Sequence, residues 1–77
     1  MDVTEIIKKL GGAPRLASAL GLPGEGVGAL RVRAWGYRQS IPGEYWADIA
    51  AFSKENGFGV SLEDLAQAHA ARRAEAA

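Results

Sequence analysis

The residues with the clearest chemical potential are four arginines in the first half of the chain. Arg15, Arg31, Arg33 and Arg38 lie in a stretch where Glu25 is the only acid. The guanidinium group is permanently charged, and its planar fork of N–H donors matches phosphate oxygens and the O6 and N7 atoms of guanine. We therefore expect this stretch, called the basic band below, to bind an anionic partner.

Other kinds of chemistry have little support in the residue types. The chain has no cysteine and a single histidine, His69, so neither a thiolate site nor a histidine cluster is available for a metal ion. Glycines at positions 21, 24, 26 and 28 resemble a phosphate-binding loop, but no strand precedes them and no lysine follows at the required place. Acids of the second half have ordinary surface spacing: Asp48, Glu55, Glu63 and Asp64. We expect no enzymatic activity, no cofactor and no metal, and we interpret His69 as a polar residue at the edge of a helix stripe rather than a pH switch.

The overall composition is that of an ordinary small folded chain. With 77 residues, 48% of them hydrophobic, we expect one domain over 1–77 with a single core and fraying of the tail at 70–77. Nine basic and nine acidic residues give zero net charge, so affinity for nucleic acid must come from how charge is distributed. No segment approaches the roughly 18 consecutive apolar residues of a membrane span. We expect a cytoplasmic protein without a membrane partner.

The basic band must be positioned by helices. Asp2 and Glu5 form a capping-box pattern, and the apolar residues that follow recur at the spacing of an amphipathic helix. Gly11 and Gly12 end this helix, because glycine adopts left-handed dihedrals without a steric penalty. Similar signals predict helices over 14–20, from position 28 or 29 to 38, from Pro42 to 56, and from a second capping-box pattern at 61 onward. No stretch alternates with period two, so the expected fold is all-α, a compact bundle of about five helices.

The second and third expected helices have the features of a helix-turn-helix. This motif needs a small residue where two helices cross, a glycine where the chain turns, and apolar anchors on the second helix. Ala17, Gly21, Val32 and Trp35 meet these needs. The pattern resembles the Cro-like, lambda-repressor-like helix-turn-helix proteins of phage repressors and YdaS-type antitoxins. The resemblance covers roughly residues 3 to 65, and its matching residues are Leu10-Gly11-Gly12, Leu16-Ala17, Leu20-Gly21, Val32, Trp35 and Ile41-Pro42.

One part of the chain departs from the family pattern. Between Gly21 and Val32 the chain is about five residues longer than the family pattern, and the extra segment is 23–27. An alternative alignment takes Val27 as the valine of the family, which lengthens the third helix and places the glycines of the loop inside it. Three glycines disfavour that helix by about 1 kcal/mol each.

The resemblance implies a sequence-specific DNA-binding transcriptional regulator, of the phage or mobile-element repressor type, that acts as a homodimer on double-stranded DNA. In the family the third helix lies in the major groove. At about 100° per residue, Gly28, Val32 and Trp35 fall on one side of this helix, and Leu30, Arg33, Ala34 and Tyr37 fall on the other. The expected DNA contacts are Arg33 as the main base reader, Arg31, Tyr37, Arg38 and Gln39 at bases and phosphates, and Arg15 at a phosphate.

A second hypothesis is a protein-interaction module on the same scaffold without DNA binding of its own, such as an antirepressor, an antitoxin or an adaptor for polymerase or another regulator. Zero net charge, the lengthened turn and the apolar residues Leu30 and Tyr37 favour it, whereas the basic band disfavours it. Trp35, Trp46, Tyr45 and Phe52 are expected in packing rather than base stacking. For a dimer, the fourth and fifth helices offer apolar surface: Trp46, Phe52, Phe58, Leu62 and Leu65.

Overall fold

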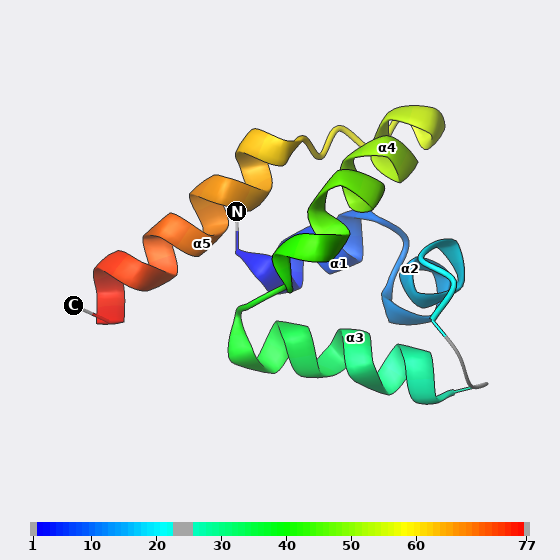
Figure 1. Ribbon diagram of the computed structural model, residues 1–77, viewed down its shortest axis with the longest axis horizontal. Coiled ribbons are helices and arrows are strands. Elements are labelled where there is room, and N and C mark those ends of the chain that lie inside the picture. The colour runs from blue at the N-terminus through cyan, green and yellow to red at the C-terminus, as the bar shows by residue number, and fades with distance from the viewer. Residues whose placement is uncertain (1, 23–25, 77) are drawn as a thin grey trace.

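The computed structural model describes residues 2–22 and 26–76, with side chains described up to Ala70. These residues form five α-helices and one short 3₁₀ helix, and no strand occurs among them. The elements are α1 (Val3–Lys9), α2 (Ala13–Ala19), α3 (Val27–Arg38), η1 (Gly43–Tyr45), α4 (Trp46–Asn56) and α5 (Leu62–Ala76). Helices α1 to α4 gather around one core, and the C-terminal part of α5 extends beyond them (Figure 1). The prediction of an all-α fold with about five helices is confirmed.

The core takes apolar side chains from all five helices and from three connections, which contribute Leu10, Ile41 and Val60. Its members are Val3, Ile6, Ile7, Leu10, Ala13, Leu16, Ala17, Val32, Trp35, Ile41, Ile49, Val60, Leu65 and Ala68. Trp35 is the largest of the fully buried side chains, with 1% of its surface exposed, and its ring centroid lies 5.1 Å from that of Tyr45. The prediction that Trp35 packs in the core is confirmed.

Local signals set the helix ends where the sequence predicted caps. The Asp2 carboxylate accepts a hydrogen bond from the backbone N–H of Glu5 at 2.8 Å and so caps α1. At the start of α5, Ser61 and Asp64 bond reciprocally, with backbone N–H to side-chain oxygen distances of 3.0 and 3.1 Å. Gly12, after α1, has a φ of 94°, which glycine tolerates best. The capping box at Ser61 and Asp64 and the glycine stop therefore form as predicted, and at α1 the Asp2 half of the predicted box is formed.

The starts of the third and fourth helices differ from those that the sequence predicted. Helix α3 begins at Val27, one residue early, and it ends at Arg38 as predicted, where Gln39 enters the left-handed region with a φ of 53°. Pro42 has an extended ψ of 135° and precedes η1, so it does not belong to the first turn of the fourth helix. The α-helix itself starts at Trp46.

Part of the lengthened turn, residues 23–25, lies outside the described residues. Val27 is the first residue of α3 and Gly28 lies inside the helix, as the alternative alignment with a longer helix requires. Gly26 instead precedes the helix with a φ of 82°. At the other end of the chain α5 is helical to Ala76, and fraying of 70–77 stays a prediction.

Candidate nucleic-acid interface

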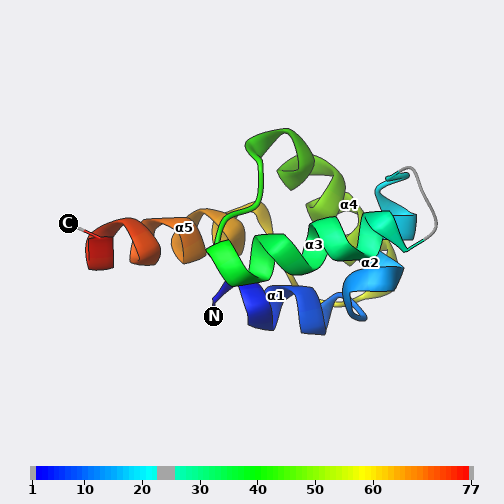
Figure 2. The same cartoon turned by 90° about the horizontal axis from the view of Figure 1, so that it is seen from below.

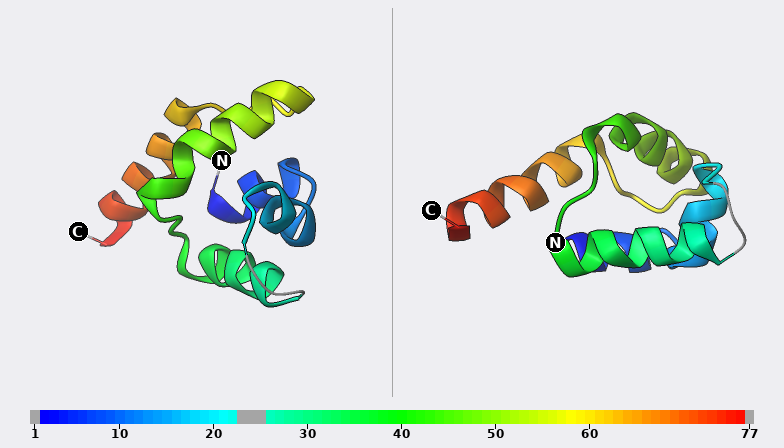
Figure 3. Two further views of the ribbon diagram at one scale, coloured as in Figure 1. Left: turned by 45° about the vertical axis from the view of Figure 1, so that its right-hand side comes forward. Right: turned by 60° about the horizontal axis from the view of Figure 1, so that its bottom comes forward.

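Helix α3 lies along one edge of the molecule, with α1 and α2 on one side of it. It packs mainly against α2 and then against α1, and no other described element covers its outer side (Figures 2 and 3). Gly28, Val32 and Trp35 are buried, which confirms the predicted inner side of the helix. The twelve residues of α3 include three arginines and no acid. The exposed side of the helix is therefore a basic surface.

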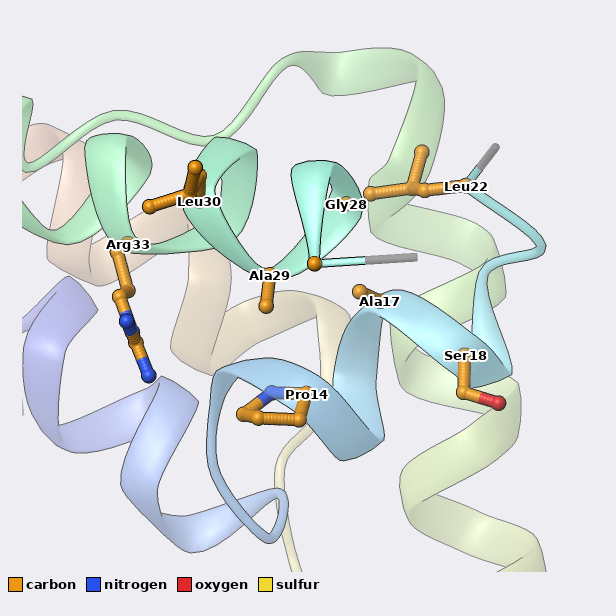
Figure 4. A pocket seen from close by; sticks show the side chains of 9 residues that line it. Pro14, Ala17, Ser18, Leu22, Gly28, Ala29, Leu30 and Arg33 are labelled. Atoms are coloured by element: carbon orange, nitrogen blue, oxygen red, sulfur yellow. The ribbon is translucent and has the colours of Figure 1, made fainter. Parts of the chain in front are cut away.

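Helices α2 and α3 approach each other closely at Gly28. A Cβ atom added to Gly28 would lie 3.2 Å from the Cβ of Ala17 and 3.2 Å from the Cβ of Leu22, which is tighter than ordinary carbon contacts of about 3.5 to 4.0 Å. Figure 4 shows these residues meeting between the two helices. Gly21 turns the chain after α2 with a φ of 67°. The crossing with small residues and the glycine turn are consistent with the predicted helix-turn-helix.

The centre of the exposed face of α3 is apolar. Leu30 and Tyr37 expose 61% and 89% of their surfaces, and Val27 exposes 59%. Ala34, which is partly buried, lies between Leu30 and Tyr37 on the same side of the helix. We call these four residues the apolar ridge. Large apolar side chains that remain this exposed on one helix face indicate a binding surface rather than a packing surface.

The arginines of α3 lie on the two sides of the apolar ridge. Arg33 lines the groove between α3 and α2 and also the neighbouring groove between α3 and α1. In Figure 4 its side chain points toward α1 and α2, while Leu30 projects to another side of the helix. Arg31 and Arg38 instead line a shallow depression on the η1 side, together with Glu44. All three arginines are exposed, so positive charge borders the ridge on both sides.

Arg15 does not belong to this surface. Its guanidinium carbon lies 5.0 Å from the ring centroid of Phe58, which is cation–π distance. Phe58 belongs to the α4–α5 connection, and in Figure 1 the C-terminal end of α4 and α3 lie on opposite sides of α2. In this structure Arg15 packs against Phe58 instead of pointing with the α3 arginines toward a common phosphate backbone.

Gln39 has a structural role that sequence reasoning missed. Its amide oxygen accepts from the backbone N–H of Val3 at 2.9 Å, and its amide nitrogen donates to the Thr4 hydroxyl at 2.8 Å and to the Gly36 carbonyl. One side chain thus caps the start of α1 and the end of α3. The sequence-based assignment of Gln39 to DNA contact is not supported by this geometry, because these bonds occupy both ends of its amide.

His69 is a second residue whose role was missed. It is buried, its Nε2 accepts from the backbone N–H of Ile41 at 2.8 Å, and its Nδ1 lies 2.7 Å from the Leu65 carbonyl. The indole N–H of Trp46 donates to the Ile41 carbonyl at 2.8 Å, and its ring centroid lies 4.6 Å from that of His69. His69 and Trp46 therefore fix the peptide that leads from α3 to η1.

Most of the apolar surface expected to form a dimer is used inside the chain. Leu65 is fully buried, and Trp46, Phe52 and Phe58 pack partly buried against the core. The Phe52 and Phe58 rings meet edge to face at 5.4 Å. Leu62 remains 50% exposed. The prediction that Trp46 and Phe52 serve in packing agrees with this arrangement, while the homodimer stays a prediction.

A metal-binding cluster and a membrane-spanning helix are both absent from the part of the chain that the structure describes. No group of three or more histidine or acidic side chains there could hold a metal ion. None of the described helices is long and apolar enough to cross a membrane. The exposed face of α3, with its three arginines and its apolar ridge, is the candidate functional surface.

Comparison of the chain with protein-family models, with characterised proteins and with solved structures gave no match. The assignment of function consequently rests on the residues and their geometry.

Proposed function

We propose that this chain is a sequence-specific DNA-binding transcriptional regulator that inserts α3 into the major groove. The observation that carries the proposal is the exposed face of α3, where arginines border an apolar ridge on both sides and the helix contains no acid. A helix with its side chains is about 10 to 12 Å across and fits a major groove about 12 Å wide. With α3 in the groove, the phosphate backbones of its two walls face the arginines on the two sides of the ridge.

Each arginine of α3 can donate to phosphate oxygens or to guanine. Arg31 and Arg38 serve one wall of the groove, and Arg33 serves the other wall or the base edges. Tyr37 adds an exposed hydroxyl and ring at the centre. Gln39 holds α3 against α1, and so fixes the angle at which the helix is presented.

One recognition helix covers only a few base pairs, so we propose that two copies act together on an inverted repeat. A two-fold dimer would place its recognition helices about 34 to 36 Å apart, one helical turn of DNA. Such a regulator works in the cytoplasm. Its proposed class is the repressor of phage or mobile-element type, in line with the resemblance described above.

The test is fluorescence anisotropy with DNA from upstream of the gene for this chain and a shuffled duplex of equal composition. With three arginine–phosphate contacts in each of the two chains, the dimer is predicted to have a salt slope of about −5.4, or about 1,800-fold weaker binding between 50 and 200 mM salt. Arg33→Ala should weaken binding to both duplexes and make it less dependent on salt. Lys54→Ala removes the same charge from an exposed position on α4 and should leave binding unchanged. Absence of salt-sensitive DNA affinity, for any sequence, refutes the proposal.

The second candidate is a protein-interaction module, and the observation that favours it is the exposure of Leu30 and Tyr37. A protein groove would cover this apolar ridge directly and would respond weakly to salt. Under that hypothesis the chain binds neither duplex, and a partner recovered from cell extract loses affinity with Leu30→Ala but keeps it with Lys54→Ala.

A further inference from the structure

The direction that points straight out from α3 is occupied by apolar side chains. Opposite the buried Val32 and Trp35, at about 100° per residue, stand Leu30 and Tyr37. Arg33 is turned from this direction by about 50° toward α2, and the other two arginines by about 100° to the opposite side. The exposed face thus has an apolar centre and charged flanks.

In a major groove, the side chains that point straight out from an inserted helix meet base edges, and those on its flanks meet phosphates. The main apolar feature of the base edges there is the C5-methyl group of thymine, which projects next to the O4 acceptor. Leu30 has no polar atom with which to read a donor or an acceptor. A thymine methyl is consequently the base feature that matches it.

We propose that α3 reads thymine methyl groups through Leu30 and Tyr37, and that Arg31, Arg33 and Arg38 mainly bind the flanking phosphates. This inference rests on the proposed DNA-binding function and names the bases that the same surface recognises. The charge pattern favours this occupant, because positive groups on both sides of an apolar ridge match a groove with a phosphate backbone on each wall. Guanine reading would instead require an arginine at the centre.

Removing a thymine methyl group that contacts the apolar ridge should cause a measurable loss of DNA affinity. A methyl group buried against Leu30 or Tyr37 favours binding by about fourfold, which corresponds to about 0.8 kcal/mol per buried carbon. Replacing thymine by deoxyuridine removes this methyl and leaves every hydrogen-bonding group of the base pair in place. A contacted thymine therefore gives about a fourfold loss on this replacement, and a thymine away from the ridge gives none.

The experiment begins with selection of duplexes from a random 20-base-pair library by the full chain. Each thymine of the selected duplex is then replaced in turn by deoxyuridine, and affinity is measured by anisotropy at 100 mM salt. We expect at least one position at which the native chain loses about fourfold. With Leu30→Ala the loss at that position disappears, whereas with Arg33→Ala the thymine duplex binds more weakly but the fourfold difference remains.

Leu62→Ala is the matched control, because this leucine is also half exposed but lies at the start of α5. It should bind both duplexes like the native chain, and circular dichroism checks that each variant is folded. The inference is overturned if the selected sites have no fixed thymine, or if affinity for thymine and deoxyuridine is equal at all positions. In either case, salt-sensitive binding still supports the proposed function. Loss of any salt-sensitive DNA binding overturns both.

Discussion

Replacing Gly28 and Gly36 separately by alanine tests the close approach of α2 and α3. Both glycines lie in terminal turns of α3, so both substitutions gain helix propensity, up to about 1 kcal/mol. They differ in the space that the new methyl group enters. At Gly36 the added carbon would make ordinary contacts, 3.5 Å from the Thr4 hydroxyl and 3.6 Å from the Ile7 methyl.

At Gly28 the added carbon would lie 3.2 Å from Ala17 and from Leu22, and 3.4 Å from the Leu22 carbonyl. These atoms must move by a few tenths of an ångström, and overpacking of this kind typically costs about 1 to 3 kcal/mol. We therefore expect Gly36→Ala to stabilise the fold by about 0.5 to 1 kcal/mol. Gly28→Ala should range from neutral to about 2 kcal/mol less stable, because the overpacking offsets its gain in propensity.

Thermal unfolding followed by circular dichroism measures the difference. For a domain of this size, 1 kcal/mol shifts the Tm by about 4 to 8 °C, so Gly36→Ala should melt at least about 2 °C above Gly28→Ala. The native chain is expected to melt below Gly36→Ala. Equal shifts in the two variants would refute the close approach of α2 and α3 at Gly28, and with it the helix crossing that presents the ridge.

Three further substitutions test stability and one tests binding. His69→Ala leaves the buried N–H of Ile41 without an acceptor and opens a cavity, so urea denaturation should show a loss of about 2 to 4 kcal/mol. Gln39→Ala removes the bonds that join α1 to α3 and should cost about 1 to 2 kcal/mol in the same assay. The backbone N–H of Ser61 donates to the Asp64 carboxylate and lowers the pKa of Asp64. The ionised carboxylate therefore stabilises the fold above the ordinary aspartate pKa of 3.8, and this stabilisation is lost as the pH falls below that value. Asp64→Asn should consequently show a smaller drop in Tm on acidification than the native chain. Glu44→Gln removes the acid beside two α3 arginines and should strengthen DNA binding, and unchanged or weaker affinity would contradict phosphate contact at that depression.

The helices and the inner side of α3 could be predicted because their causes are local. Asp2 caps α1 through a residue three positions away, and Gly28, Val32 and Trp35 share one side because of helical periodicity. The same periodicity predicted the outer side, where Leu30 is exposed as expected. Signals of this kind do not depend on how the helices pack against one another.

The roles of Gln39 and His69 could not be predicted because their partners are distant in sequence. Gln39 bonds to Val3 across 36 positions, and His69 bonds to Ile41 across 28 positions. A glutamine after a basic helix has the same appearance in sequence whether it contacts DNA or caps another helix. In the same way, the ring that Arg15 covers belongs to the distant α4–α5 connection. Only the packing of the helices decides between these roles.

The zero net charge of the chain does not weaken the case for a DNA-binding surface. At physiological ionic strength the Debye length is about 8 Å, so a phosphate responds mainly to charges within that distance. Helix α3 carries three arginines and no acid, whereas Asp48 and Glu55 lie on α4, above the core in Figure 1, with α3 below it. Arg33→Ala and Lys54→Ala lower the net charge equally, yet their effects on DNA affinity should differ. If the two variants bound DNA equally well, net charge rather than the α3 surface would control the affinity.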